Sequence, residues 1–490
     1  MKLSSLIGEE IGLDPDIVGL ASDSREVQPD FLFAALKGGG VDGADYIDAA
    51  VERGATAVLC SEDAAQRTVD ALYKDVALVP SENPRKALAN VASSFYPSRP
   101  DAIVGVTGTN GKTSTAWFCT GIWSHLGKRA GSIGTLGAIS PDQTFKLIHT
   151  TPDPITLHQK LSEMKNAGVD RVAMEVSSIG LDQYRADGVR LHAAGFTNIS
   201  QDHLDYHGSF GHYFDAKKRL FTDLLNKDGV AVVNADGAGA AEMTKAIVAS
   251  GRRVTTIGAH GEDIKTMSIE PRIDGVCAKV RVGTHELRFR LNCIGAFQVG
   301  NALTAAALCA VSEPDLSMPE VVLASDGLTA PPGRMEYIGM HAGGAVYVDY
   351  AHTPDALKTA LAAARAHTTS RLSVVFGAGG DRDRTKRPEM GRVAHELADR
   401  VIVTDDNPRT EDPSLIRSEV LVGATDGIDI GDRREAIDAG IAGLADGDIL
   451  IVAGKGHEQG QLVNGTLHPF DDASVIRDVL SARSDNQRVN

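Results

Sequence analysis

The stretch AIVGVTGTNGKTSTAWFCTGIW, residues 102–123, points to the fold class because three local patterns follow one another in it. Residues 102–106 are apolar and predict a buried strand, and TGTNGKT is a loop bracketed by glycines. Lys112, Thr113 and Ser114 then open a helical pattern. A strand, a glycine-rich loop and a helix cradle phosphate, because backbone N–H groups and the helix N-terminus face the anion. The stretch therefore predicts an α/β domain that binds a nucleotide.

The residues of this loop have expected roles. Lys112 is expected to reach the β- and γ-phosphates, and the Thr113 hydroxyl to occupy a position on Mg²⁺. The loop is a short variant, because Val106 stands where G-x-x-x-x-G-K-[ST] has its first glycine. The alternative is a glycine-rich turn without nucleotide, but the intact GKT and both flanking elements favour binding. The predicted ATP-binding loop comprises Gly108, Thr109, Asn110, Gly111, Lys112, Thr113 and Ser114.

Length and composition are typical of a large α/β protein with several cores. The chain has 490 residues, 42% of them hydrophobic and 51 of them glycine, and such a length suggests roughly two to four domains. The net charge of -16 disfavours nucleic-acid binding, which relies on Lys and Arg contacts to phosphate, and also an anionic membrane surface. We expect a monomer with no nucleic-acid partner.

Cysteine usage and hydropathy predict a cytoplasmic location. The five cysteines are widely spaced and form no C-x-x-C, which argues against a disulfide framework and a zinc site and suits a reducing compartment. The N-terminal MKLSSLIGEEIGL lacks a basic region before an apolar core, so we expect no signal peptide. No apolar run approaches the roughly 18 residues of a membrane span.

Proline and glycine clusters divide the chain twice. They lie at FYPSRPDA, residues 95–102, and at GLTAPPGRME, residues 327–336, and such clusters between periodic segments are typical of linkers. The predicted domains are therefore residues 1–98, 99–332 and 333–490.

The last third alternates between strand and helix patterns. Apolar runs that predict strands alternate with helical patterns such as 355–367 and 390–400, which favours a parallel, doubly wound sheet. Three of the predicted strands run directly into GAGGDRD, TDDNPR and AGKGHE, and ligands of such sheets bind at the carboxyl ends of strands. The predicted strands are 345–350, 372–377, 400–405 and 448–454.

A group of polar residues follows the phosphate loop. Glu175 lies at the end of the predicted strand 171–178, where a buried carboxylate needs either a salt bridge or a cation such as Mg²⁺. Three histidines follow at 203, 207 and 212, and the intervening glycines exclude a zinc-binding helix face. For Lys217, Lys218 and Arg219, periodicity alone favours a solvated basic helix face.

Eight ordered motifs resemble the Mur ligase family of peptidoglycan synthesis, and most closely its MurE type, which adds the third residue to UDP-N-acetylmuramoyl-L-alanyl-D-glutamate. The motifs are TGTNGKT, TTPDP (150–154), MEVSSIGLDQYR (174–185), FTNISQDHLDYHG (196–208), YFDAKKRLF (213–221), GAFQVGNALTAAA (295–307), APPGRME (330–336) and VDYAHTPDAL (348–357). The resemblance implies three domains: one that binds the UDP-sugar, a central P-loop-type ATPase, and a C-terminal Rossmann-like domain that binds the incoming amino acid.

The implied reaction is ATP-driven amide formation through an acyl phosphate, in cell-wall biogenesis. The catalytic residues implied by the resemblance are Lys112, Glu175, His203 and Lys217. Of these, Glu175 and His203 match magnesium-site positions, together with Thr113. Lys217 stands where the family has a carbamylated lysine (N6-carboxylysine), whose negative charge would help to hold Mg²⁺.

The resemblance also implies three sets of binding residues. Around ATP they are Asn301, Arg334 and Asp349. For the UDP-sugar dipeptide they are Ser24, Thr150, Thr151, Ser177, Gln183 and Arg185, with GGGVDG (38–43) on the uridine side and His149 where the family has Asn. For the amino acid they are Arg382, Asp406, Asn407, Pro408, Arg409, Gly454 and Glu458.

The DNPR sequence, residues 406–409, is the family's marker for meso-diaminopimelate, which carries one more carboxylate than lysine. Arg409 suits that carboxylate as a bidentate donor, Glu458 suits the distal ammonium, and Asn407 can pair with either group. The neighbouring acids Asp405, Glu411 and Asp412 are expected only to solvate the loop. The alternatives are a lysine-adding relative, a folylpolyglutamate synthetase-like ligase, and a P-loop regulatory module without catalysis.

Overall fold

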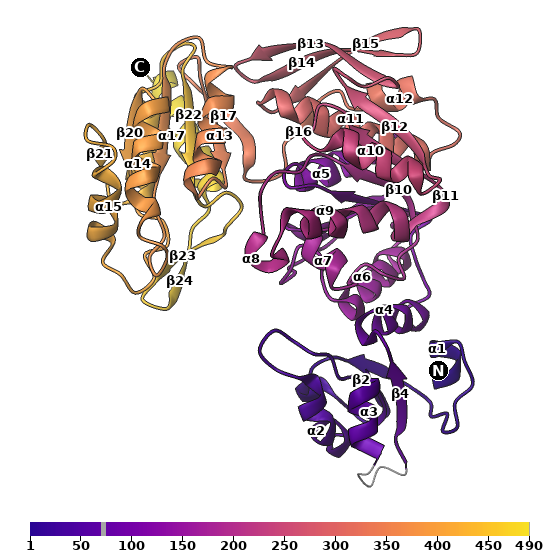
Figure 1. The fold of residues 1–490 in the computed structure, drawn as a ribbon. Coiled ribbons are helices and arrows are strands. Elements are labelled where there is room, and N and C mark those ends of the chain that lie inside the picture. The colour runs from indigo at the N-terminus through magenta and orange to yellow at the C-terminus, as the bar shows by residue number, and fades with distance from the viewer. Residues whose placement is uncertain (70–74, 490) are drawn as a thin grey trace. The chain divides into compact units, whose positions relative to one another are not determined.

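The computed structural model describes residues 1–69 and 75–489. The chain forms two compact units, Met1–Thr256 with Leu308–Asp315, and Ile257–Ala307 with Leu316–Asn490. Figure 1 shows the order of the elements along the chain, from indigo at the N-terminus to yellow at the C-terminus. In the part of the chain that the structure describes, no helix combines the length and the apolar character needed to cross a membrane.

The first unit begins with a parallel sheet in the order β1-β2-β3-β4. Side chains alternate between two cores on its two faces, with Leu32 and Leu59 in one core and Phe33 and Val58 in the other. Its elements are α1 (Leu3–Ile7), β1 (Gly19–Ala21), η1 (Ser24–Glu26), β2 (Phe31–Ala34), η2 (Gly43–Tyr46), α2 (Ile47–Glu52), β3 (Ala55–Ser61), α3 (Glu62–Val69), β4 (Ala77–Ser81) and α4 (Pro84–Phe95).

The second sheet of this unit holds the phosphate loop, and β5 lies between β10 and β9 in the strand order. The three strands are parallel, so the loops that follow them emerge at one edge. The elements are β5 (Ala102–Thr107), α5 (Lys112–His125), β6 (Ala130–Gly134), β7 (Gly137–Ile139), β8 (Thr144–Phe145), α6 (Pro154–Asn166), β9 (Arg171–Glu175), α7 (Ser178–Asp182), β10 (Leu191–Phe196), α8 (Leu204–His207), α9 (Phe210–Arg219), the π-helical turn η3 (Leu220–Leu224), β11 (Leu225–Asn234) and α10 (Ala240–Ala249).

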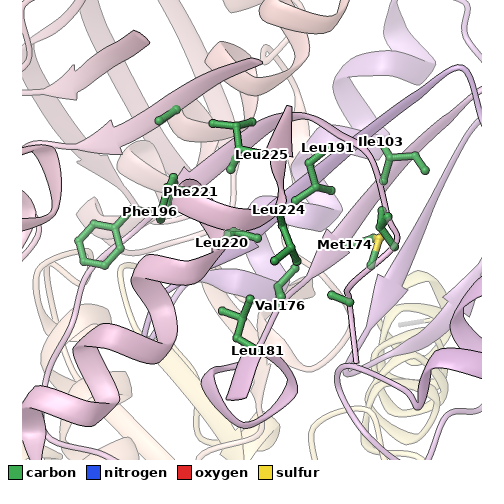
Figure 2. Close-up of a cluster of buried hydrophobic side chains, with 14 of the residues drawn as sticks. Ile103, Met174, Val176, Leu181, Leu191, Phe196, Leu220, Phe221, Leu224 and Leu225 are labelled. Atoms are coloured by element: carbon green, nitrogen blue, oxygen red, sulfur yellow. The ribbon is translucent and has the colours of Figure 1, made fainter. Parts of the chain in front are cut away.

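A buried cluster fixes these strands against the helices beside them. Figure 2 shows side chains of β5, β9 and β10, such as Ile103, Met174 and Phe196, gathered with Leu220 and Phe221 of η3. These side chains are almost fully buried, so the carboxyl ends of the three strands are set by packing. The predicted strand 102–106 and the helix that opens at Lys112 are confirmed. The predicted strand 171–178 ends earlier, because Ser177 caps helix α7.

The N-terminal part of the second unit contains an antiparallel meander of three strands, β13 to β15, followed by two helices, α11 and α12. Strand β14 pairs with β13 on one side and β15 on the other. Strand β12 and helix α11 each include residues of both units. The elements are β12 (Arg253–Gly258), β13 (Ile264–Arg272), β14 (Gly275–Val282), β15 (His285–Asn292), α11 (Ala296–Ser312), α12 (Met318–Leu323) and β16 (Leu328–Thr329).

The C-terminal sheet has the order β17-β18-β22-β19-β20-β21. All pairs are parallel except β17 with β18, so the predicted doubly wound sheet is confirmed with one added antiparallel edge strand. Successive residues such as Val374 and Val375 enter different cores on opposite faces. The strands are β17 (Arg334–His341), β18 (Gly344–Asp349), β19 (Leu372–Phe376), β20 (Arg400–Val403), β21 (Ile428–Asp429) and β22 (Ile449–Ala453), with the hairpin β23 (Gly460–Val463) and β24 (Thr466–Pro469).

The helices of this sheet differ by a few residues from the sequence patterns. The predicted helix 390–400 begins four residues earlier and ends at Leu397, since Pro388 lies in its first turn, where proline is tolerated. The helices are α13 (Pro354–Arg365), α14 (Lys386–Leu397), α15 (Pro413–Leu421), α16 (Arg433–Ala442) and α17 (Asp472–Val489).

Candidate active site

The loop after β5 requires glycine at both ends. Gly108 has φ 154° and Gly111 has φ 87°, and both values are strained for residues with a side chain. A Cβ at position 108 would overlap with Oγ1 of Thr197. Gly111 is the N-cap of α5, so the first backbone N–H groups of that helix face the loop. The backbone therefore has the shape that holds a phosphate group.

Neighbouring loops hold this loop in place. The backbone N–H of Asn110 donates to Oδ1 of Asn198 at 3.1 Å, and Nδ2 of Asn198 donates back to the Asn110 carbonyl at 3.2 Å. The Thr109 and Tyr213 hydroxyls are 2.9 Å apart. Nζ of Lys112 donates to the carbonyls of Gly108 and Thr109 at 2.9 and 2.8 Å. Lys112 thus lies over the loop that it is predicted to serve.

Glu175, at the end of β9, is buried against the phosphate loop. Its Oε2 accepts from the Thr113 hydroxyl at 2.9 Å, and its Oε1 accepts from the backbone N–H of Thr135 at 2.8 Å. The side-chain oxygens of Glu175 accept hydrogen bonds from the Thr113 hydroxyl and from the N–H and hydroxyl of Thr135, and all these described partners are neutral. Of the two explanations for a carboxylate here, this arrangement favours a cation over a salt bridge.

The donor set around Glu175 fits Mg²⁺. A carboxylate and a hydroxyl are hard oxygen ligands, which Mg²⁺ prefers. In the residues that the structure covers, no three or more His, Cys, Asp or Glu side chains are grouped to hold a metal ion. A Mg²⁺ ion held here by Thr113 and Glu175 would take its other ligands from phosphate oxygens and water, as is usual for this ion.

Lys217 corrects the interpretation from periodicity. It is 1% exposed, so a solvated basic face is wrong for this residue. Its Nζ donates to the Gly108 carbonyl at 2.8 Å and lies 4.6 Å from the centre of the Tyr213 ring. Burial, with the nearby charge of Lys112, lowers the pKa of Lys217 to about 6. Its neighbour Lys218 is partly exposed and pairs with Asp215 on the same helix.

His203 begins the short helix α8 with φ 52°, an uncommon value for histidine. Its side chain is about half exposed, and its ring lies 6.4 Å from the Tyr213 ring, above which the Lys217 ammonium also lies. His207 instead is buried, with Nε2 3.0 Å from the Ser178 hydroxyl. The structure thus separates a partly exposed His203 from a structural His207.

Five of the predicted substrate residues form one polar network beside Glu175. The Thr150 and Thr135 hydroxyls are 3.1 Å apart, and the Thr151 hydroxyl donates to the Glu175 carbonyl at 3.0 Å. The Arg185 guanidinium donates to the Thr151 carbonyl at 2.9 Å. Two further contacts run from the Ser177 N–H to Thr151 Oγ1 at 2.9 Å and from Arg185 Nη2 to Gln183 Oε1 at 2.7 Å.

Ser24, the sixth predicted substrate residue, is not a member of this network and belongs to η1, after β1. The sequence interpretation missed two members of the network. One is Thr135, and the other is Tyr206, whose hydroxyl accepts from Gln183 at 3.0 Å and donates to Asp182 at 2.8 Å. Tyr206 lies inside the quoted motif FTNISQDHLDYHG, whereas Thr135 had no local signal.

In the second unit, strand pairing places Arg334 opposite Asp349. The Arg334 guanidinium lies 4.8 Å from the centre of the Tyr350 ring, and its buried Nε has no hydrogen-bond partner among the described residues. The Asp349 carboxylate accepts from the backbone of Met335 and Ala351, and burial raises its pKa. Asn301 lies elsewhere in this unit, on α11, where Nδ2 donates to Gln298 at 2.9 Å.

The loops after β19, β20 and β22 carry the predicted amino-acid residues. Nη1 of Arg409 donates to the Gly380 carbonyl at 2.6 Å, and Arg409 has φ 54°. A Cβ on Gly379 would lie 2.8 Å from Arg409 Nη1, so glycine there leaves room for the guanidinium. Gly454 likewise has φ 115°, and its missing Cβ would meet Asp406 Oδ2 at 2.5 Å. Arg382 is exposed on the loop after β19.

Asn407 and Glu458 are in direct contact across two of these loops. Nδ2 of Asn407 donates to Oε2 of Glu458 at 2.9 Å. Lys455, which the sequence interpretation missed although it lies in the quoted AGKGHE, is fully buried and donates to Oδ1 of Asn407 at 3.1 Å. Pro408 is buried between Asn407 and Arg409. The loops therefore meet at a group of charged and amide side chains.

The expectation for the neighbouring acids was wrong. Asp405 pairs with Arg417, and Asp412 caps α15 by accepting from the Ser414 N–H at 2.8 Å. Glu411 pairs at 2.7 Å with Arg387, which is 2% exposed, and this contact lowers the pKa of Glu411 to about 2. These acids hold the loop to the helices beside it, because each finds a partner that is distant in sequence or lies in a helix.

Comparisons with known proteins agree with this arrangement of sheets and loops. Three family models match the chain: "Mur ligase family, catalytic domain" at residues 16–96, "Mur ligase middle domain" at 106–309, and "Mur ligase, glutamate ligase domain" at 333–456. The chain therefore belongs to the Mur ligase family. The resemblance and the three-domain α/β architecture predicted from the sequence are confirmed.

Relatives that share one name match almost the whole chain. The UDP-N-acetylmuramoyl-L-alanyl-D-glutamate--2,6-diaminopimelate ligase of Caulobacter vibrioides is 45% identical over 98% of this chain and 98% of its own. The enzyme of that name from Brucella melitensis is 46% identical over 96% and 95%. A solved structure titled with the same name has 30% identity, covers 99% of both chains and has a TM-score of 0.74.

Proposed function

We propose that this chain is an ATP-dependent ligase that joins meso-2,6-diaminopimelate to UDP-N-acetylmuramoyl-L-alanyl-D-glutamate in peptidoglycan precursor synthesis. The observation that carries the proposal is the loop at residues 404–409, where Asn407 and Arg409 follow a strand of a parallel sheet. The same chain has a complete phosphate loop. Relatives named for this reaction match it over nearly their full length.

The chemistry requires activation, because a carboxylate is a poor electrophile. A carboxylate oxygen of the muramoyl dipeptide attacks the γ-phosphorus of ATP, the bond to ADP breaks, and an acyl phosphate forms. The amine of diaminopimelate then attacks the acyl carbon, and phosphate leaves as the amide forms. The amine proton passes to a base or to solvent. The enzyme contributes mainly position and charge neutralisation.

Residues around the phosphate loop divide these tasks. Lys112 and the backbone N–H groups of residues 108–114 bind the phosphates. Thr113 and Glu175, which share a hydrogen bond, would hold Mg²⁺. His203, whose ring contacts that of Tyr213, is proposed as a further magnesium-site residue on the resemblance. A bound Mg²⁺ ion neutralises the charge of the transferred phosphoryl group. Arg334, Asp349 and Asn301 are proposed to bind ATP on the resemblance, with Arg334 and Asp349 paired in register.

Lys217 is proposed to carry the carbamate. Its Nζ is buried 2.8 Å from the Gly108 carbonyl, beside the place proposed for phosphate. In the modification, the neutral amine attacks CO₂, a C–N bond forms and a proton leaves, so a neutral buried amine becomes a negatively charged carbamate. The lowered pKa supports this proposal, because it leaves the amine neutral at pH 7.

The muramoyl dipeptide is proposed to bind along the network beside Glu175. That network offers the Arg185 guanidinium to a carboxylate and the Thr150 and Ser177 hydroxyls to other polar groups. Gln183 and Thr151 orient Arg185, while Ser24 and the loop 38–43 are proposed for the UDP end.

The amino-acid site is proposed to distinguish diaminopimelate from lysine. Arg409 and Asn407 are assigned to the distal carboxylate and Glu458 to the distal ammonium, with Arg382, Asp406, Pro408 and Gly454 completing the site. If lysine bound, the charge of Arg409 would lack its partner, which disfavours the lysine-adding alternative. The folylpolyglutamate alternative is disfavoured because a family model also matches residues 16–96. The domain boundaries 1–98, 99–332 and 333–490 remain part of the proposal.

One assay tests the function. The purified protein receives ATP, Mg²⁺ and the UDP-linked dipeptide, with diaminopimelate, lysine or glutamate in turn, and both phosphate release and the ligated product are measured. We expect product with diaminopimelate and little with the other two. Phosphate release that is the same with and without each amino acid would overturn the proposed reaction. A preference for lysine or glutamate would instead support the lysine-adding or the folylpolyglutamate synthetase-like alternative.

A further inference from the structure

Lys455 is a fully buried lysine that no part of the proposed reaction uses. It follows Gly454 at the carboxyl end of β22 and is 0% exposed, so it does not reach a ligand itself. Its Nζ lies 3.1 Å from Oδ1 of Asn407 and 3.5 Å from Oε2 of Glu458. A buried ammonium is costly unless it is paired, so these two contacts account for its presence in this place.

The contacts of Lys455 fix the orientation of the Asn407 amide. Oδ1 of Asn407 accepts from Lys455 Nζ and also from the backbone N–H of Leu462 at 2.9 Å. An ammonium and a backbone N–H can only donate, so the atom that they share must be the amide oxygen. The NH₂ group therefore points the other way, and one of its hydrogens binds Glu458 at 2.9 Å.

The same contacts divide the Glu458 carboxylate. Oε2 is engaged by both Asn407 and Lys455, whereas Oε1 has no hydrogen bond from any described residue. The Glu458 side chain is 37% exposed, so Oε1 can meet a ligand. The pair then presents one donor group, the Asn407 NH₂, and one acceptor, Glu458 Oε1. That pattern complements a carbon carrying both a carboxylate and an ammonium, as the distal carbon of diaminopimelate does.

We propose that Lys455 is a positioning residue that sets amino-acid specificity. It holds the Asn407 amide with its N–H donors toward the substrate carboxylate, and it also contacts Oε2 of Glu458. This inference rests on the proposed amino-acid site. The sequence left open whether Asn407 pairs with a carboxylate or an ammonium of the substrate. With Lys455 in place, Asn407 presents N–H donors and therefore binds the carboxylate. Without Lys455, Oδ1 of Asn407 keeps only the Leu462 N–H as a donor, so the orientation of the amide is held less firmly.

The test is substrate discrimination, measured as the ratio of kcat/KM for diaminopimelate to that for lysine. In Lys455→Met, the ratio is expected to fall about tenfold or more, as for loss of a hydrogen bond to a charged group. KM for ATP is expected to stay within about twofold, because a positioning role at the amino-acid loops leaves the nucleotide alone. Lys358→Met, at an exposed lysine on α13, is the matched control and should keep the wild-type ratio.

A double-mutant cycle separates positioning from a general effect on folding. In an Asn407→Ala background, Lys455→Met should change the ratio much less than in the wild type, because only its longer contact with Glu458 remains. Additive losses, or a folded Lys455→Met with the wild-type ratio, would overturn the inference.

A second variant decides the matter if Lys455→Met does not fold. Asn407→Asp keeps an oxygen that accepts from Lys455 but has no N–H donor for the substrate carboxylate. This variant should lose the preference for diaminopimelate. Retention of that preference would contradict the inference. Wild-type protein that does not prefer diaminopimelate would instead refute the proposed function, so the two failures are distinguishable.

Discussion

A buried ammonium beside a phosphate loop is unfavourable for folding unless its charge changes, and Lys217 is such a group. Its neighbour Lys218 on the same helix is partly exposed and pairs with Asp215. Burial rather than helix position therefore distinguishes the two lysines, and a carbamate at Lys217 would suit a site that holds a cation.

Replacement of Lys217 tests the carbamate. Lys217→Ala is expected to lower kcat about 100-fold or more, as when one preorganised charged group is removed. A short carboxylate such as formate should restore part of the activity, because it can occupy the vacated space and supply the negative charge. The measurement is ligation rate against formate concentration. Lys218→Ala is the control and should keep near wild-type rates, and a loss that formate does not relieve would argue against the carbamate.

Arg409 is the residue on which diaminopimelate selection is expected to depend most. Arg409→Ala should reduce kcat/KM for diaminopimelate about 100-fold or more, because a buried carboxylate contact loses its charged partner. KM for ATP should be nearly unchanged. Arg392→Ala removes an exposed arginine of α14 and is the matched control. Equal loss of nucleotide affinity in Arg409→Ala would count against the site assignment.

At the scale of the elements, one buried arginine joins the loop after β20 to two helices. Arg387 of α14 contacts Glu411 in that loop and Glu419 of α15, each at 2.7 Å. The loop that carries Arg409 is therefore anchored to α14 by the ion pair between Glu411 and Arg387. This support explains how Arg409 keeps a positive φ without glycine, since surrounding contacts can stabilise such backbone strain.

The Glu411–Arg387 pair predicts a pH dependence of stability. The folded pKa of Glu411, about 2, lies below its ordinary value of 4.5, so the stabilisation is full above pH 4.5 and is lost as the pH falls toward 2. Glu411→Gln is expected to lower the free energy of unfolding by about 1–3 kcal/mol at pH 7. Urea unfolding at pH 7 and pH 3 should show that the difference from wild type shrinks at the lower pH.

Glu396→Gln is the control for that comparison. Glu396 pairs with Arg392 on the surface of α14, and such exposed pairs contribute about 0.5 kcal/mol or less. A Glu411→Gln variant whose deficit does not shrink at pH 3 would show that the charge of Glu411 is not what stabilises the loop.

At the scale of the whole molecule, nucleotide binding is expected to depend on a divalent cation. ATP with Mg²⁺ should raise the melting temperature, because a ligand that binds only the folded chain stabilises it by about 2.7 kcal/mol at 100 times its Kd. Removing Mg²⁺ with a chelator should weaken that stabilisation and abolish ligation. Thermal unfolding with ATP, with and without chelator, measures this, and an unchanged ATP shift in Glu175→Gln would contradict the assigned cation site.

Local sequence patterns were enough for the architecture. The strand, loop and helix of residues 102–123 and the parallel C-terminal sheet follow from apolar periodicity and from glycine positions, which depend on near neighbours in the chain. The ordered motifs also located the residues proposed for ATP and Mg²⁺. The residues proposed for diaminopimelate lie in GGDRD, DNPR and AGKGHE, and these loops directly follow predictable strands.

Tertiary structure decided the environments of those residues. Contacts between segments far apart in sequence determine three of these environments. They bury Lys217, give Glu175 neutral partners, and orient Asn407 through Lys455. A helical pattern marks which residues share a face but not what covers that face, so Lys217 was expected in solvent. The DNPR loop illustrates both contributions. Its residue types indicate the chemistry of Arg409 and Asn407, whereas the packing of side chains distant in sequence determines which atoms these two residues present to a ligand.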